Sequence, residues 1–166
     1  MSRIGKTLSD YGEYHRDRRN LLTHAVGVPM IVLALMVLLG RPAFTIPVLG
    51  LPANLALTLT ALAGVWYIEL DTKMGLLMTL LLALFYALGR QIAEISTLAW
   101  LGGGIALLII GWAFQFIGHH YEGRKPAFID DMKSLLVGPL FMVAEGLFAL
   151  GLARGLRHEV EAANAH

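Results

Sequence analysis

Five long apolar blocks, separated by short polar segments, dominate the sequence. A helix crosses the hydrocarbon core of a bilayer with about 20 apolar residues, within a range of about 17–25. Three blocks meet this length, and the two short ones fit tilted spans or buried re-entrant helices. We therefore expect an all-α, integral membrane helical bundle of four to five transmembrane or re-entrant helices in a single domain, residues 1–166. The expected helical spans cover residues 21–39, 46–68, 74–89, 98–117 and 135–153.

The polar N-terminal segment, residues 1–20, predicts a short amphipathic helix ahead of the first span. The sequence TLSD, which begins at Thr7, resembles a capping box and would start this helix. Asn20 suits the N-cap of the first span, which would then begin at Leu21. A break between the two helices follows from this pair of start signals.

The amino-acid composition excludes several classes of function. Hydrophobic residues make up 57% of the chain and charged residues 15%, against about 45–50% and about 25% in average soluble domains. Disorder, collagen and a nucleic-acid-binding tail are excluded, and a net charge of +1 implies no nucleic-acid partner. Because the chain has no cysteine, disulfides, thiolate nucleophiles, Fe–S clusters and cysteine-based zinc sites are excluded. Oxygen and nitrogen atoms remain as possible metal ligands.

Basic residues predict the orientation in a membrane. Cytoplasmic loops are enriched in Lys and Arg, and most of the 13 Lys and Arg residues lie in the N-terminal segment and in the loop at 118–134. No cleavable signal peptide is evident. We expect a cytoplasmic N-terminus and an even number of crossings between these two polar segments, which places both at the cytoplasmic membrane face.

These two segments hold four of the six histidines. His15 and His24 are nine residues apart, which puts them on opposite faces of an unbroken helix. They converge only if the helix breaks between them. The other two histidines, His158 and His166, lie in the polar C-terminal tail, residues 154–166, and we expect both to be solvated.

The second segment offers His119, His120 and Glu122. His119 and Glu122 are three apart and share a helical face. His119 and His120 are about 100° apart on a helix, so both face one ion only where the backbone is irregular. Gly118 and Gly123 would permit that irregularity.

A histidine-rich site supported by carboxylates suits iron, zinc, copper or nickel, and open-sided sites of this kind are typical of non-haem Fe(II) oxygen chemistry. Three interpretations remain open: an iron enzyme, a zinc-dependent lipid hydrolase using the same histidines, and a non-enzymatic membrane-structuring or transport-accessory protein with interfacial histidines. Glu145, inside the fifth block, is either an outer partner of a ligand histidine or a polar contact in helix packing.

The segments YGEYHRDRRNLLTHAVGVP and QFIGHHYEGRKPAF resemble two motifs of a family of small multi-span membrane proteins of bacteria and fungi. The family is typified by the fungal endoplasmic-reticulum enzyme that converts 2-hydroxy fatty acids, derived from phytosphingosine, to odd-numbered fatty acids. The resemblance covers about Ser9 to Ala149. It implies an Fe(II)-dependent dioxygenase that performs α-oxidation, giving a fatty acid one carbon shorter. The matching residues are His15, Asn20, His24, Gly118, His119, Glu122, Pro126 and Ala127.

The resemblance also implies a site. The catalytic residues would be His15, His24, His119 and Glu122, and the Fe(II) ligands would be His15, His24 and His119, with His120 or Glu122 completing the set. The 2-hydroxy fatty acid would meet Asn20 and the cations Arg124 and Lys125, although these two cations are equally explained by topology alone.

The expected partners are the 2-hydroxy fatty acid, O2 and membrane lipid. The bacterial members of the family suggest the bacterial inner membrane. The Gly-rich run at 102–104 permits close helix packing between protomers, so a homo-oligomer is compatible with the sequence.

Overall fold

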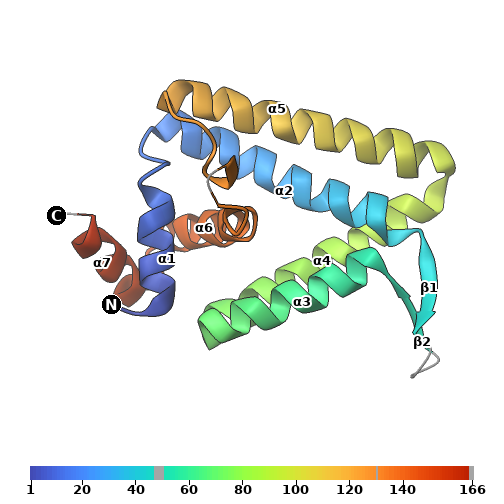
Figure 1. Ribbon diagram of the computed structural model, residues 1–166, viewed down its shortest axis with the longest axis horizontal. Coiled ribbons are helices and arrows are strands. Elements are labelled where there is room, and N and C mark those ends of the chain that lie inside the picture. The colour runs from blue at the N-terminus through green and yellow to red at the C-terminus, as the bar shows by residue number, and fades with distance from the viewer. Residues whose placement is uncertain (47–50, 130, 165–166) are drawn as a thin grey trace. The chain divides into compact units, whose positions relative to one another are not determined.

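The computed structural model describes residues 1–46, 51–129 and 131–164, and this part of the chain is mainly helical (Figure 1). Its α-helices are α1 (Arg3–Gly12), α2 (Arg18–Gly40), α3 (Leu55–Leu70), α4 (Thr72–Ile95), α5 (Gly104–Glu122), α6 (Ser134–Ala149) and α7 (Arg154–Ala163). A six-residue π-helix, η1 (Leu98–Gly103), leads into α5, and a short 3₁₀ helix, η2 (Ala127–Ile129), precedes α6. The helical character expected from the apolar blocks is confirmed.

Three helical segments of the described part are long and apolar enough to cross a membrane: α2, α4 and the continuous stretch Leu98–Glu122. The pair α6 and α7 would make a fourth, but the two helices are bent by 112° at the break between them. Helix α3 is apolar but has only 16 residues. The chain thus offers three to four candidate spans, at or below the lower end of the expected number.

The second apolar block differs from the expected helix over residues 46–68. Strand β1 (Ala43–Ile46) pairs antiparallel with strand β2 (Leu51–Asn54), and helix α3 begins only at Leu55. Asn54 caps that helix, since its side-chain oxygen accepts from the Leu57 backbone N–H at 2.8 Å. The physical reason lies in Pro52 and Asn54: a proline favours extended backbone before it, and an asparagine favours an N-cap over a helix interior. Residues 47–50 of the expected span lie outside the described residues.

The N-terminal helices begin earlier than expected. Helix α1 starts at Arg3 rather than after Thr7, because Ser2 caps it by accepting from the Gly5 backbone N–H at 3.1 Å. Helix α2 starts at Arg18 rather than Leu21. Its capping interaction comes from Asp17, whose carboxylate accepts from the Arg19 backbone N–H at 2.8 Å.

The chain divides into two compact units, residues 1–28 with 113–166 and residues 29–112. In the first unit, α1 packs against α6 and α7. Ser2 donates to the Glu159 carboxylate from both its backbone N–H and its hydroxyl, at 2.9 and 2.5 Å, and the Ser9 hydroxyl lies 2.7 Å from Asn164 Oδ1. The expected polar tail is therefore in large part the packed helix α7.

In the second unit, α3 and α4 form an antiparallel helix pair joined by a tight turn. Asp71 caps α4 by accepting from the Met74 backbone N–H at 2.8 Å. Gly75, in the first turn of α4, lies directly against the backbone of Tyr67 and Ile68 at the end of α3, so any Cβ at position 75 would clash with main-chain atoms. The turn between α3 and α4 therefore requires glycine at this position.

We expect Gly75→Ala to lower the free energy of unfolding by about 1–3 kcal/mol, because the added methyl group meets backbone rather than a side chain that can move. Gly146→Ala is the matched control, since a Cβ there meets nothing within 4 Å and Ala is the better helix former. Thermal unfolding in detergent measures both. A Gly75→Ala protein at least as stable as wild type would contradict the packing described here.

Candidate metal centre

Three histidines from two distant segments converge in the first unit. His15 lies in the non-helical stretch between α1 and α2, His24 in the second turn of α2, and His119 in the last turn of α5. Their ring centroids are 4.7, 4.9 and 5.3 Å apart in pairs. One ring nitrogen of each lies within 4.8 Å of the others. The spacing of His15 and His24 requires a helix break between them, and this break allows their side chains to lie together.

The ring orientations of His15 and His24 are set by backbone carbonyls. His15 Nδ1 lies 3.0 Å from the Tyr11 carbonyl oxygen, and His24 Nδ1 lies 3.0 Å from the Asn20 carbonyl oxygen. A carbonyl only accepts, so each Nδ1 carries the hydrogen and each Nε2 keeps its lone pair. A metal-binding histidine is commonly oriented in this way.

The cluster has polar atoms that lack partners. His15, His24 and His119 are 3%, 1% and 7% exposed. Within the described residues, His15 Nε2 and His119 Nδ1 are buried and make no hydrogen bond. Buried polar atoms almost always have a partner, and a metal ion would give these nitrogens one. The residues present therefore fit a metal ion.

Aromatic side chains cover His15. The Tyr11 ring stacks on the imidazole with centroids 4.3 Å apart and planes 12° from parallel, and Phe141 of α6 lies 5.7 Å away. Burial lowers the pKa of His15 below its ordinary value, and the hydrogen bond to the Tyr11 carbonyl and the charge of Glu122 oppose this only in part. His15 is therefore neutral at pH 7, as a metal ligand must be.

Glu122, at the end of α5, joins the two histidine segments. Its carboxylate accepts from the backbone N–H groups of Arg16 and Asp17 at 3.0 and 2.9 Å and from Asn20 Nδ2 at 3.0 Å. Arg16 and Asp17 lie in the non-helical stretch directly before α2, whereas Asn20 lies in its first turn, and the N-terminal end of a helix attracts negative charge. Glu122 thus binds the N-terminal end of α2 and fixes the stretch that carries His15.

Gly118 lets α5 approach α2 at the level of the histidines. A Cβ at this position would clash with Thr23 Oγ1 and Asn20 Oδ1 and would lie 3.0 Å from His24 Nδ1. Only glycine leaves room for these three atoms. The next residue, His119, is thereby held against His24.

The other predicted site residues are placed differently. Asn20 is fully buried and belongs to the Glu122 contact, not to the helix cap. His120, although adjacent to His119, is exposed and is not brought into the cluster. Arg124 and Lys125 are exposed as well, and Arg124 Nη1 donates to the Glu13 carbonyl at 3.1 Å.

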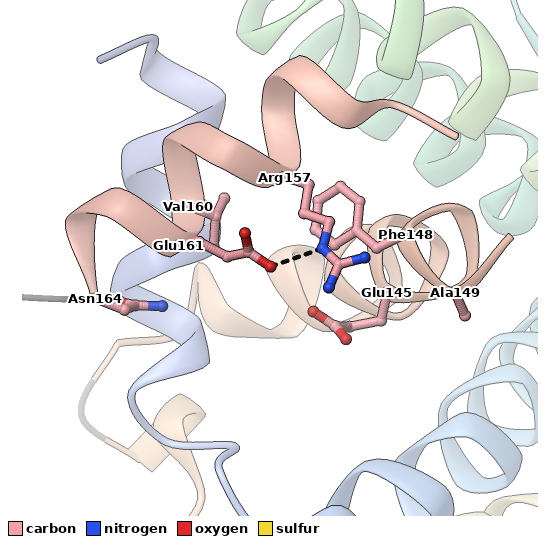
Figure 2. A pocket seen from close by; sticks show the side chains of 7 residues that line it. All are labelled: Glu145, Phe148, Ala149, Arg157, Val160, Glu161 and Asn164. Carbon is pink, nitrogen blue, oxygen red and sulfur yellow. Dashed lines mark hydrogen bonds and ion pairs between the residues drawn. The ribbon is translucent and has the colours of Figure 1, made fainter. Parts of the chain in front are cut away.

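Glu145 lines a separate pocket of about 300 Å³ between α6 and α7 (Figure 2). Its charged neighbours are Arg157 and Glu161, which pair with each other through Nε and Oε1 at 2.7 Å. This placement favours a polar contact in helix packing over the alternative of an outer partner for a ligand histidine. Among the histidines of the tail, His158 is exposed on α7, as expected, and His166 lies outside the described residues.

Gln115, a buried polar residue of α5, is not among the site residues predicted from the sequence motifs. It is 6% exposed and lies one turn before His119 in α5. The signal was present in the sequence, because Gln115 is a polar residue four positions before a candidate ligand within an otherwise apolar block.

We expect Gly118→Ala to weaken metal binding at least tenfold, because displacing α5 from α2 moves His119 away from His24. Losing the support of a ligand typically costs a factor of about 10–100 in metal affinity. Gly103→Ala is the control, since a Cβ there meets nothing within 4 Å. Co(II) titration of the purified proteins measures the effect, and equal affinities for wild type and Gly118→Ala would refute it.

Metal binding should weaken as the pH falls below about 6.5, the ordinary histidine pKa. Because the pKa of His15 is lowered in the folded protein, its contribution to stability is complete above the unfolded value and is lost as the pH falls toward the folded one. Co(II) titrations and thermal unfolding between pH 8 and 5 measure both effects. Affinity and stability that stay constant over this range would contradict a buried, neutral His15.

Comparison with known proteins agrees with the resemblance found in the two histidine segments. A model of the family described as Mpo1-like, 2-hydroxy-palmitic acid dioxygenase, matches residues 1–150. The chain is 35% identical over 161 residues to the 2-hydroxy-palmitic acid dioxygenase MPO1 of Saccharomyces cerevisiae, across 93% of this chain and 87% of the yeast protein. No solved structure matches the chain significantly. With most of its length covered by both comparisons, the chain belongs to the Mpo1-like family.

Proposed function

We propose that this chain is an Fe(II)-dependent dioxygenase that converts 2-hydroxy fatty acids to fatty acids one carbon shorter. The observation that carries the proposal is the buried cluster of His15, His24 and His119 in a chain whose yeast relative is named a 2-hydroxy-palmitic acid dioxygenase. The cluster provides the ligands, and the relative's name points to the reaction class.

His15, His24 and His119 would hold the metal. Fe(II), when bound, would supply the redox chemistry with O2 that zinc lacks. Glu122 is better suited to positioning than to ligation, because its two oxygens already accept three hydrogen bonds. His120, being exposed, is not needed for a three-histidine site.

The carboxylate and the alkyl chain of the substrate would bind to different parts of the protein. Arg124 uses one donor on the Glu13 carbonyl, and a guanidinium has five, so it retains donors for a carboxylate. We assign Arg124 and Lys125 to attracting the acid to the site, and Asn20 to ordering the wall of the site through Glu122. The alkyl chain would lie among the apolar helices, where it need not leave the lipid.

The apolar spans and the basic N-terminal segment support a membrane setting for this reaction. We propose that residues 1–166 act as one membrane domain in a bacterial inner membrane, with the N-terminus and the histidine site at the cytoplasmic face. Many basic residues flank the site in sequence, including Arg16, Arg18 and Arg19, as the positive-inside rule requires. Close helix packing at the Gly-rich run at 102–104, where η1 leads into α5, would allow a homo-oligomer.

The test compares His119→Ala with its neighbour His120→Ala. Each protein is loaded anaerobically with Fe(II), exposed to O2 and 2-hydroxypalmitate, and assayed for bound iron and for product chain length by mass spectrometry. We expect about one iron per wild-type chain and a product one carbon shorter. His119→Ala should lose the iron and at least about a hundredfold of the activity, because a buried ligand is removed, whereas His120→Ala should retain both.

Other results would overturn the proposal in identifiable ways. A wild-type protein that binds zinc alone and consumes no O2 would favour a zinc-dependent hydrolase. A protein that binds no transition metal at neutral pH would indicate a non-enzymatic membrane protein. Equal losses in His119→Ala and His120→Ala would show that the ligand set is not the buried cluster.

A further inference from the structure

Gln115 carries a buried hydrogen-bond donor that has no partner in the described part of the chain. Its side chain is 6% exposed, and within the described residues its Nε2 makes no hydrogen bond. Leaving a buried amide without a partner destabilises a protein. In an apolar helix such as α5, leucine would fill the same space without this cost, so the amide calls for a partner beyond the residues that the structure describes.

The position of Gln115 indicates where that partner lies. Gln115 precedes His119 by four residues, so the two side chains occupy the same face of α5 one turn apart. Side chains on a helix lean toward its N-terminus, so the His119 imidazole extends over the turn that contains Gln115. Gly118, between them, is the point at which α5 meets α2 beside His24. The unpartnered donor thus belongs to a residue on the face of α5 that carries His119, one helical turn before the three-histidine cluster.

We propose that Gln115 is a substrate-contacting residue, whose amide N–H donates to an oxygen of the 2-hydroxy carboxylate group held at the three-histidine site. This inference rests on the proposed function. A 2-hydroxy carboxylate offers three oxygen acceptors, while the neighbouring imidazoles, once they bind a metal, offer none. A neutral amide also suits this place, because it binds an anion without introducing a second charge into an apolar helix.

If the Gln115 amide acts as a hydrogen-bond donor to the ligand, two substitutions of Gln115 should have different effects. Gln115→Leu keeps the approximate volume and removes the donor. Gln115→Glu keeps the shape but presents an acceptor to an anionic ligand. Neither substitution removes a hydrogen bond found within the described part of the protein, so a merely structural role predicts that both leave ligand binding unchanged or that both disturb the metal site.

The experiment uses the full chain in detergent, loaded with Co(II) under anaerobic conditions, so that no turnover occurs. The visible absorption of Co(II) reports metal binding first and then binding of 2-hydroxypalmitate. Gln91→Leu is the matched control, because Gln91 is the only other glutamine in the chain and is exposed on α4.

We expect Gln115→Leu to bind Co(II) within about twofold of wild type and to unfold at no lower temperature. It should bind 2-hydroxypalmitate about tenfold more weakly or worse, as expected for loss of a hydrogen bond to a charged group. Gln115→Glu should bind it more weakly still, and Gln91→Leu should match wild type. With Fe(II) and O2, the main effect of Gln115→Leu should be a raised KM.

Unchanged binding of 2-hydroxypalmitate by Gln115→Leu would overturn the inference while leaving the proposed function intact. Parallel loss of Co(II) and 2-hydroxypalmitate would show that Gln115 supports the fold and does not contact the ligand, which also overturns it. If wild-type protein binds neither Co(II) nor Fe(II), the proposed function itself fails, and that result is seen before any variant is compared.

Discussion

The candidate site depends on one carboxylate. Glu122, at the end of α5, accepts hydrogen bonds from two backbone N–H groups more than 100 residues away, at Arg16 and Asp17, and from the amide of Asn20. Hydrogen bonds to an ionised acceptor are stronger than those between neutral groups. The negative carboxylate of Glu122 also lies beside the electropositive N-terminal end of α2. This contact holds the non-helical stretch of His15 beside the helix that carries His119. Without it, the stretch that carries His15 would lose its hydrogen bonds to the end of α5.

Packing around this contact brings the three histidines together. Gly118 brings α5 against α2, and the ring of Tyr11 lies flat on His15. Helix α1, which carries Tyr11, is in turn held by α6 and α7 through contacts such as Ser9 with Asn164. The C-terminal helices therefore support the site from a distance, although they contribute none of the three clustered histidines.

Local features of the sequence predicted much of this arrangement. The apolar blocks predicted the long helices because hydropathy is a property of each segment by itself. The spacing of His15 and His24 required a helix break, and the adjacent His119 and His120 were both candidates that could face one ion only where the helix is irregular. The structure supplies the break at residues 13–17 and leaves His120 exposed.

The features that sequence reasoning missed depend on contacts between distant residues. Asn20 looked like a helix cap because its type suits one, but Asp17 takes that role and frees Asn20 for Glu122. Glu122 resembles a ligand by its spacing from His119, but that spacing does not reveal the donors at Arg16 and Asp17 that its carboxylate accepts from. The polar sequence of residues 154–166 predicts a tail, because it gives no sign that α7 packs on α1.

X-ray absorption at the metal edge tests most directly whether one ion is held by three histidines from the two segments. In protein loaded with one equivalent of Fe(II) or zinc, we expect a first shell with three imidazole nitrogens, at about 2.0–2.1 Å for zinc. The His15→Ala protein should show one imidazole fewer, or no bound metal. A wild-type first shell of oxygen atoms alone, or one that His15→Ala leaves unchanged, would contradict this assignment.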